Sequence, residues 1–370
     1  MNASGAMLAR LAAVGLAAGV FLASAARHAR GVDFAGVNDA KMAWRPTETR
    51  AAAAAAMAAA GARHVRLMLV RPFDAVAESA LALKREGVSV LLMVPLGQPD
   101  FFAPPVPART ADDVHYALRP TAEMDPGRYE AFLREALAVL DARGVRAEAV
   151  ELGNEINISP FEATLPVVEG GLAVDAAGFE RQSFAARYEQ ALDRYVEILR
   201  TTRALLSGRP TPVLMASVVS PEKAWAAEHG VSVVAPEVVM RMLMKRGAGD
   251  LVDGFAVHLY PQVGAREADP EKAVREAVDA AFDPLVREVG PGRRWWITEW
   301  GFARSVGRDS GLELPRGRRM IAFAAAVEAR PEAASMGPAF LYDFSDDELF
   351  RISGPDSPSD PDALLTLSRR

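Results

Sequence analysis

SVLLMVP at residues 89–95 and PVLMASVV at residues 212–219 are the stretches that decide the fold. Each is a nearly continuous run of apolar residues bounded by polar or turn-forming sequence. Parallel strands that are buried on both faces have this composition, because helices cover both sides of their sheet. The two runs therefore predict strands of a parallel α/β sheet.

Outward from these two runs, six more short apolar segments bring the expected strands to eight. They are Val32–Val37, His64–Val70, Ala147–Gly153, Val252–Tyr260, Trp295–Trp300 and Pro338–Phe344. Helical sequence lies between strands, and Pro284 is expected to kink or split one of the helices. These helices are Thr47–Gly61, the segment from Asp125-Pro126-Gly127 to Arg143, Phe184–Leu206, Pro236–Arg246, Ala273–Val289 and Arg316–Glu328.

This alternation over eight units favours a (β/α)8 TIM barrel with a single domain over its rival, a doubly wound open sheet. We expect the barrel to cover residues 31–352. Residues 353–370 begin with sequence rich in Pro, Ser and Asp and are expected to form a loosely packed tail. No glycine-rich phosphate loop follows any expected strand, which excludes the usual Rossmann and P-loop interpretations.

The N-terminus carries a predicted targeting signal. Arg10 precedes an apolar run from Leu11 to Ala23, and small residues follow at Ala23-Ser24-Ala25. This pattern predicts a signal peptide over residues 1–25 and a secreted or periplasmic protein. The run is short for a membrane span, although an uncleaved anchor is the alternative.

Composition excludes several classes of protein. Half of the 370 residues are hydrophobic, which allows a large core, and the formal net charge of −6 without a basic stripe argues against nucleic acid as a partner. With no cysteine, disulfides, thiolate metal sites and a cysteine nucleophile are excluded. The five histidines are scattered, so we expect no metal and no cofactor. A monomer is the expected state.

Two motifs carry the chemistry. ELGNEIN at 151–157 ends one expected strand with Asn154 and Glu155, and RWWITEWGF at 294–302 places Glu299 at the end of another. Polar groups at the end of an apolar strand are costly to bury unless they are paired or functional. The C-terminal ends of barrel strands form the active-site face, so both carboxyls should meet there.

This pair, in this order, resembles the glycoside hydrolases of clan A over about residues 32–350. The resemblance implies that Glu155 is the acid/base and Glu299 the nucleophile of a retaining O-glycosidase. Arg66 in HVRLML is similar to the arginine beside the nucleophile in that clan. His258 and Tyr260 in FAVHLYP are similar to the clan's His-x-Tyr pair, with Tyr260 touching Glu299 and His258 near the acid/base.

The same resemblance implies that Asn154 donates a hydrogen bond to a sugar hydroxyl. Clan members of the cellulase type commonly end strand eight with tryptophan, and Tyr342 in AFLYDFSD would take that place here. Aromatic side chains on the expected C-terminal-face loops could act as flat platforms for sugar rings. These are Trp44, Phe101, Phe102, Tyr116, Phe161 and Trp300.

Alternatives remain open on the sequence alone. Glu151 also lies near the end of its strand, and it is expected to point deeper or outward unless it replaces Glu155 as the catalytic group. A non-catalytic exported carbohydrate-binding barrel would share the fold, and a transglycosylase would share both glutamates. The two motifs do not select among glucan, mannan, galactan, xylan or a bacterial exopolysaccharide.

Overall fold

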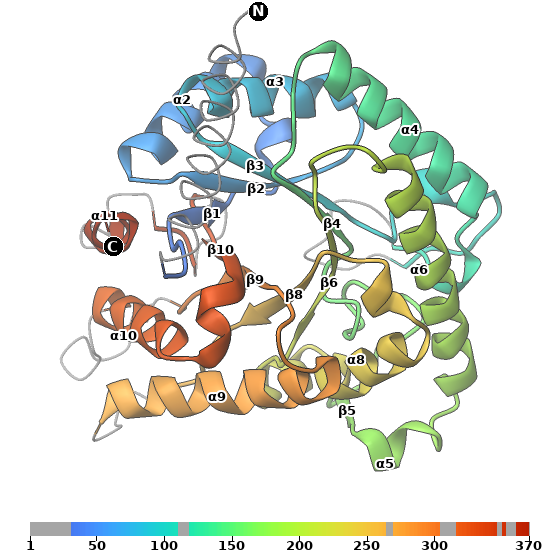
Figure 1. The fold of residues 1–370 in the computed structure, drawn as a ribbon. Coiled ribbons are helices and arrows are strands. Elements are labelled where there is room, and N and C mark those ends of the chain that lie inside the picture. Colours follow the sequence, from blue (N-terminus) through green and yellow to red (C-terminus); the bar gives the residue numbers. More distant parts are fainter. Residues whose placement is uncertain are drawn as a thin grey trace, which may run out of the picture.

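The computed structural model describes residues 31–109, 118–263, 269–303, 316–345, 350–352 and 360–369. Eight parallel strands close into a barrel in the order β1-β10-β9-β8-β6-β4-β3-β2 (Figure 1). Their bounds are β1 Gly36–Asn38, β2 His64–Met68, β3 Ser89–Val94, β4 Ala149–Leu152, β6 Val213–Val219, β8 Gly254–Leu259, β9 Trp295–Trp300 and β10 Met336–Leu341. The predicted single (β/α)8 barrel is confirmed.

Helices surround the strands and cover the outer face of the barrel (Figure 1). They are α2 Thr47–Ala59, α3 Phe73–Arg85, α4 Pro126–Ala142, α6 Ala185–Leu205, α8 Pro236–Lys245, α9 Pro270–Val289 and α10 Arg316–Glu328. Local sequence fixes several helix starts. Asp125, for example, accepts hydrogen bonds from the backbone of Gly127 and Arg128, while proline occupies the first turn of α4.

Two helix expectations need correction. The sequence analysis did not identify α3, although its apolar side chains are buried against the barrel. Helix α9 continues through Pro284 as one element and is not split. A proline in a helix removes one backbone donor, and the packing of Val278, Phe282 and Leu285 in the core offsets that loss.

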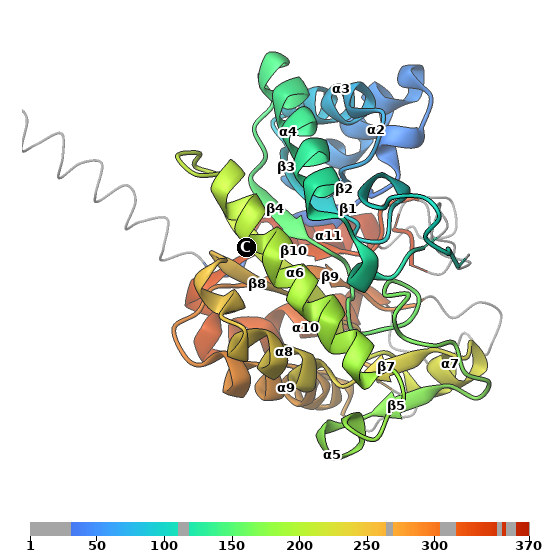
Figure 2. The ribbon, with the colours of Figure 1, turned by 90° about the vertical axis from the view of Figure 1, so that its right-hand side faces the viewer.

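The long loops after β4 and β6 carry small elements of their own. Strands β5 Leu172–Val174 and β7 Ser232–Val234 pair in parallel, and the short helices α5 Ala176–Phe179 and α7 Lys223–Glu228 belong to the same loops. Figure 2 shows β5, β7 and α7 grouped beside one end of the barrel. These elements add to the wall next to the carboxyl ends of β4 and β6.

The C-terminal end of the chain differs from the expected loosely packed tail. The expected loosely packed tail is wrong for residues 360–368, which form helix α11. Leu364 and Leu367 are buried, and Arg63 donates a 2.6 Å hydrogen bond to the carbonyl of Ser368. The predicted signal peptide lies outside the described residues. Among those that are described, no helix is both long and apolar enough to cross a bilayer.

Side chains inside the barrel form layers. One apolar cluster consists of Leu91, Met93, Ala149, Leu214, Trp296 and Phe340. Strand side chains alternate between faces, so Glu151 follows Ala149 on the inner face of β4 and lies one layer nearer the C-terminal end. Arg66 and Thr298 donate hydrogen bonds to Glu151 at this level, and this polar region forms the floor of the candidate site.

The N-terminal end of the barrel holds a half-buried ionic clasp. His64 Nδ1 lies 2.7 Å from Glu148 Oε2, and its Nε2 lies 3.2 Å from Asp33 Oδ2. Burial alone would lower the pKa of His64, but hydrogen bonds to Asp33 and Glu148 outweigh burial and raise it to about 9. The protonated ring thus ties β2 to β4 and to the segment before β1.

This clasp makes stability depend on pH. Because the folded pKa of His64 exceeds its ordinary value of 6.5, its contribution is complete below that value and is lost as pH rises through about 9. We expect His64→Gln to lower the free energy of unfolding by about 1–3 kcal/mol near pH 6 and by much less near pH 10. Urea unfolding at the two pH values measures the difference. An equal loss at both would contradict the protonated clasp.

Candidate active site

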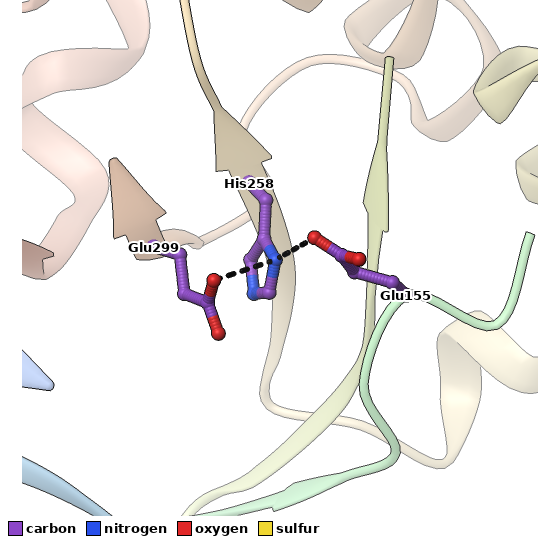
Figure 3. Close-up of side chains that lie close together, drawn as sticks. All are labelled: Glu155, His258 and Glu299. Atoms are coloured by element: carbon purple, nitrogen blue, oxygen red, sulfur yellow. Dashed lines mark hydrogen bonds and ion pairs between the residues drawn. The ribbon is translucent and has the colours of Figure 1, made fainter. Parts of the chain in front are cut away.

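Three barrel strands bring two carboxyls and an imidazole together at the C-terminal mouth. Glu155 follows β4, His258 lies on β8 and Glu299 lies on β9, and the three side chains point toward one another (Figure 3). The potential ligand atoms of all three lie within 4.8 Å of one another. Glu155 and Glu299 are each 8% exposed, so both carboxyls are largely desolvated.

The backbone after β4 turns sharply to aim Glu155 at the mouth. Gly153 has φ +102°, and a β-carbon there would come within 3.0 Å of Ala216 and Leu96. Glu155 itself has φ 42°, which costs a non-glycine residue on the order of 1 kcal/mol or more. Its backbone N–H donates to Ser217 Oγ at 3.1 Å on the neighbouring strand. Ser217, which the sequence analysis did not single out, therefore helps to hold this conformation.

Glu299 reaches the site through an irregularity in β9. The register between β8 and β9 shifts between the pairs Val257–Ile297 and His258–Glu299. Such a shift breaks strict alternation, so Thr298 and Glu299 both contribute side chains to the interior network. Without the shift, the two neighbours would face opposite sides of the sheet.

Both oxygens of Glu299 accept strong hydrogen bonds. Arg66 Nη1 donates to Oε1 at 2.5 Å, and Tyr260 Oη donates to Oε2 at 2.6 Å. Burial raises the pKa of Glu299 above its usual value, while Arg66 and Tyr260 oppose that rise. Burial also raises the pKa of Tyr260 well above its ordinary value, as does the charge of Glu299, so the phenol keeps its proton and donates. The expected contacts of Arg66 and Tyr260 with Glu299 are both present.

His258 links the two glutamates. Its Nδ1 lies 2.7 Å from Glu155 Oε1 and 3.4 Å from Glu299 Oε2. Burial holds the pKa of His258 well below 6.5, and the positive charge of Arg66 adds to this effect. The imidazole is therefore neutral. His258 Nε2 is buried without a hydrogen-bond partner among the described residues, so we assign the ring proton to Nδ1.

Arg66 organises the polar floor below the glutamates. This side chain is 1% exposed. Besides Glu299, it donates to Glu151 Oε2 from Nε at 2.6 Å, to Asn38 Oδ1 from Nη1 at 3.1 Å and to Asn154 Oδ1 from Nη2 at 2.8 Å. With its oxygen held by Arg66, the amide N–H group of Asn154 is oriented away from the guanidinium. Asn38 is a site residue that the sequence analysis did not single out, and Glu151 lies deeper in the barrel than Glu155, in one of the two positions expected for it.

The predicted aromatic residues divide into two groups. Tyr342 follows β10, and its ring packs edge-on to Tyr260 at a centroid distance of 6.3 Å. Phe350 completes this cluster, 5.5 Å from Tyr260 and 5.7 Å from Tyr342. Tyr342 thus lies beside the ring that holds Glu299, as expected of the residue in the strand-eight position. Trp44 lies in the 3-10 helix after β1 and is 37% exposed, and its role as a sugar platform stays a prediction.

The assignment of Trp300 to the substrate side is wrong. Its side chain is fully buried and stacks on Phe323 of α10 with ring centroids 4.6 Å apart. Trp300 follows Glu299 directly, and the next residue in a strand points to the opposite face. Phe101 and Phe102 are also buried, and Phe101 packs against Tyr129 of α4. Tyr116 lies outside the described residues.

Glu155, His258 and Glu299 are the ligand types that a divalent cation could use. Their oxygens and Nδ1, however, already bond to one another, to Tyr260 and to Arg66. A cation at this point would also lie close to the guanidinium of Arg66, which stays protonated and would repel it. We therefore interpret the three residues as a hydrogen-bonded acid–base cluster.

The fold and the cluster together define a (β/α)8 barrel with two buried carboxyls at its mouth. No protein-family model and no curated protein matches the sequence. Solved structures do match it in fold. A GH5-4 broad specificity endoglucanase from an uncultured bacterium has a TM-score of 0.56 at 13% identity, covering 94% of this chain and 95% of that one.

Two further structures are similar. A GH5_18 protein from Streptomyces cattleya, solved in complex with GlcNAc, has a TM-score of 0.55 at 17% identity over 92% of this chain and 79% of its own. A monomeric β-xylosidase from Caulobacter crescentus has a TM-score of 0.55 at 14% identity over 92% and 69%. The resemblance to clan A barrels that the motifs indicated is thus confirmed for the fold.

Proposed function

We propose that this protein is a retaining O-glycoside hydrolase with Glu299 as nucleophile and Glu155 as acid/base. One observation carries the proposal: oxygens of the two carboxyls lie within 4.8 Å of each other. Retaining glycosidases hold their carboxyls about 5–5.5 Å apart, whereas inverting enzymes leave about 6.5–9.5 Å for a water molecule. The separation here supports direct attack by one carboxylate.

In the first step, Glu299 attacks the anomeric carbon and the bond to the leaving oxygen breaks. Glu155 gives its proton to that oxygen, so the leaving group departs as a neutral alcohol. Arg66 and Tyr260, whose hydrogen bonds fix both oxygens of Glu299, keep the nucleophile ionised and aimed. The product of this step is a glycosyl ester of Glu299.

In the second step, water attacks the anomeric carbon of the sugar, the bond between that carbon and Glu299 breaks, and Glu299 leaves as a carboxylate. Glu155, now ionised, takes the proton from that water. The loss of negative charge on Glu299 in the ester makes ionisation of Glu155 easier at this stage. His258 donates from Nδ1 to Glu155 Oε1 and stabilises its charged form. Asn154, oriented by Arg66, donates to the sugar hydroxyl at C2.

The solved structures support the glycosidase class. The similar barrels include an endoglucanase and a β-xylosidase. A non-catalytic carbohydrate-binding barrel would have no need for two desolvated carboxyls at this separation. A transglycosylase would use the same first step and differ in the acceptor. The proposal includes export through residues 1–25 and action on a carbohydrate as a monomer.

The proposed activity is tested by incubating the protein with a panel of glucans, mannans, galactans and xylans. We expect reducing ends to appear with at least one polysaccharide and the new anomeric centre to keep its configuration in NMR spectra recorded during the reaction. Products of inverted configuration would contradict the retaining mechanism. Transfer products that replace free sugars when an acceptor sugar is added would indicate a transglycosylase.

A further inference from the structure

Glu151 is a buried carboxylate for which the two-step mechanism above has no use. It is fully buried on β4, in the layer below Glu155. Its Oε2 accepts from Arg66 Nε at 2.6 Å, and its Oε1 accepts from Thr298 Oγ1 at 3.1 Å. Since both oxygens accept hydrogen bonds and one faces a guanidinium, Glu151 carries a negative charge. Because it is fully buried within the floor of the site, against Arg66 and Thr298, Glu151 does not touch a substrate.

Arg66 is therefore shared between two carboxylates. Its Nε faces Glu151 and its Nη1 faces Glu299, at 2.6 and 2.5 Å. Within the described part of the chain, Arg66 is the one charged group that forms an ion pair with either carboxylate, because His258 is neutral. With Glu155 protonated, the buried network carries a net charge of −1. At low local dielectric such a charge acts strongly on the groups beside it.

We propose that Glu151 is a positioning residue that sets the relative rates of the two chemical steps through Arg66. This inference rests on the proposed function. During formation of the glycosyl ester, Glu299 loses negative charge and the sugar gains positive charge, and the fixed charge of Glu151 favours both changes. During ester hydrolysis, Glu299 regains negative charge, which Glu151 opposes at close range. Glu151 thus accelerates the first step and does not accelerate the second.

The electrostatics of Glu299 agree with this arrangement. Burial is the largest cause that raises the pKa of Glu299, and Arg66 and Tyr260 lower it. The negative charge of Glu151 raises the pKa of Glu299 further. A more basic carboxylate is a better nucleophile and a poorer leaving group. The same charge therefore promotes attack on the substrate and slows release from the ester.

The test compares wild type with Glu151→Gln on aryl glycosides of the sugar that the polysaccharide panel identifies. A phenyl glycoside has a poor leaving group and reports ester formation, whereas a 2,4-dinitrophenyl glycoside reports ester hydrolysis. We expect Glu151→Gln to slow turnover of the phenyl glycoside about tenfold without slowing the dinitrophenyl glycoside. We also expect the acid limb of kcat/KM to move about one pH unit lower.

Two further variants separate charge from shape. Glu151→Asp keeps the negative charge but moves it away from Arg66, because the side chain is shorter. This variant should shift the acid limb in the same direction as Glu151→Gln by a smaller amount. Glu148→Gln removes a carboxylate that directly precedes β4, at the far end of the barrel, and should leave the acid limb in place. The proposal is overturned if Glu151→Asp leaves the limb unmoved, if it matches Glu151→Gln in full, or if Glu151→Gln slows both substrates equally. A wild type that cleaves no glycoside would instead overturn the proposed function.

Discussion

Replacing Glu299 by glutamine is expected to lower hydrolysis by roughly 10⁴-fold or more, because the amide cannot form the glycosyl ester. The side chain keeps its volume, so Arg66 can donate to the amide oxygen in place of the carboxylate. Loss of the negative charge removes one of the two carboxylate partners of Arg66 and leaves Glu151 as the other. We therefore expect a moderate fall in the free energy of unfolding rather than an unfolded protein. Initial rates on the active polysaccharide and thermal unfolding together measure both effects.

Glu288→Gln is a suitable control for this substitution. Glu288 pairs with Arg241 on the outer helices, so the same chemical change there should leave turnover unchanged. Activity close to that of wild type in Glu299→Gln would remove Glu299 from the mechanism. The wild-type pH profile gives an independent check. Because the pKa of Glu299 is raised, activity should be lost on acidification at a higher pH than an ordinary glutamate would give.

The sequence specified the barrel and much of the site because the relevant signals are local. SVLLMVP and PVLMASVV are apolar at consecutive positions, and both form strands within one residue of the expected bounds. Asn154 and Glu155 directly follow an apolar strand, and parallel strands present such ends on one rim. The contacts of Arg66 and Tyr260 with Glu299 followed from a resemblance in motif order, and the structure contains both contacts.

Other features depend on contacts between distant segments, which local sequence does not display. Trp300 is expected from the sequence to lie on the C-terminal face as a sugar platform, but its stacking partner Phe323 belongs to α10. The proposed role of Glu151 depends on its hydrogen bonds with Arg66 and Thr298, which belong to two other strands. Helix α11 follows a segment rich in Pro and Ser, and the burial of its Leu364 and Leu367 depends on contacts with the rest of the barrel.

Replacing Glu155 by alanine is expected to produce a loss of activity that depends on the leaving group. Without a proton donor, turnover of a polysaccharide or a phenyl glycoside should fall by about 10²–10⁴-fold. A 2,4-dinitrophenolate leaves without a proton, so ester formation from that substrate should remain fast. The ester should then accumulate, because no base activates water, and a burst of dinitrophenolate should precede slow turnover.

Azide distinguishes the acid/base from the nucleophile. Removal of the Glu155 side chain leaves space near the ester in which azide can attack without a base. Glu155→Ala should therefore regain turnover of the dinitrophenyl glycoside in azide and yield a glycosyl azide of retained configuration, since two displacements have occurred. Glu299→Ala should yield an azide of inverted configuration, because azide then replaces the nucleophile in a single displacement. NMR of the two products measures this directly, and inverted product from Glu155→Ala would exchange the roles of the two glutamates.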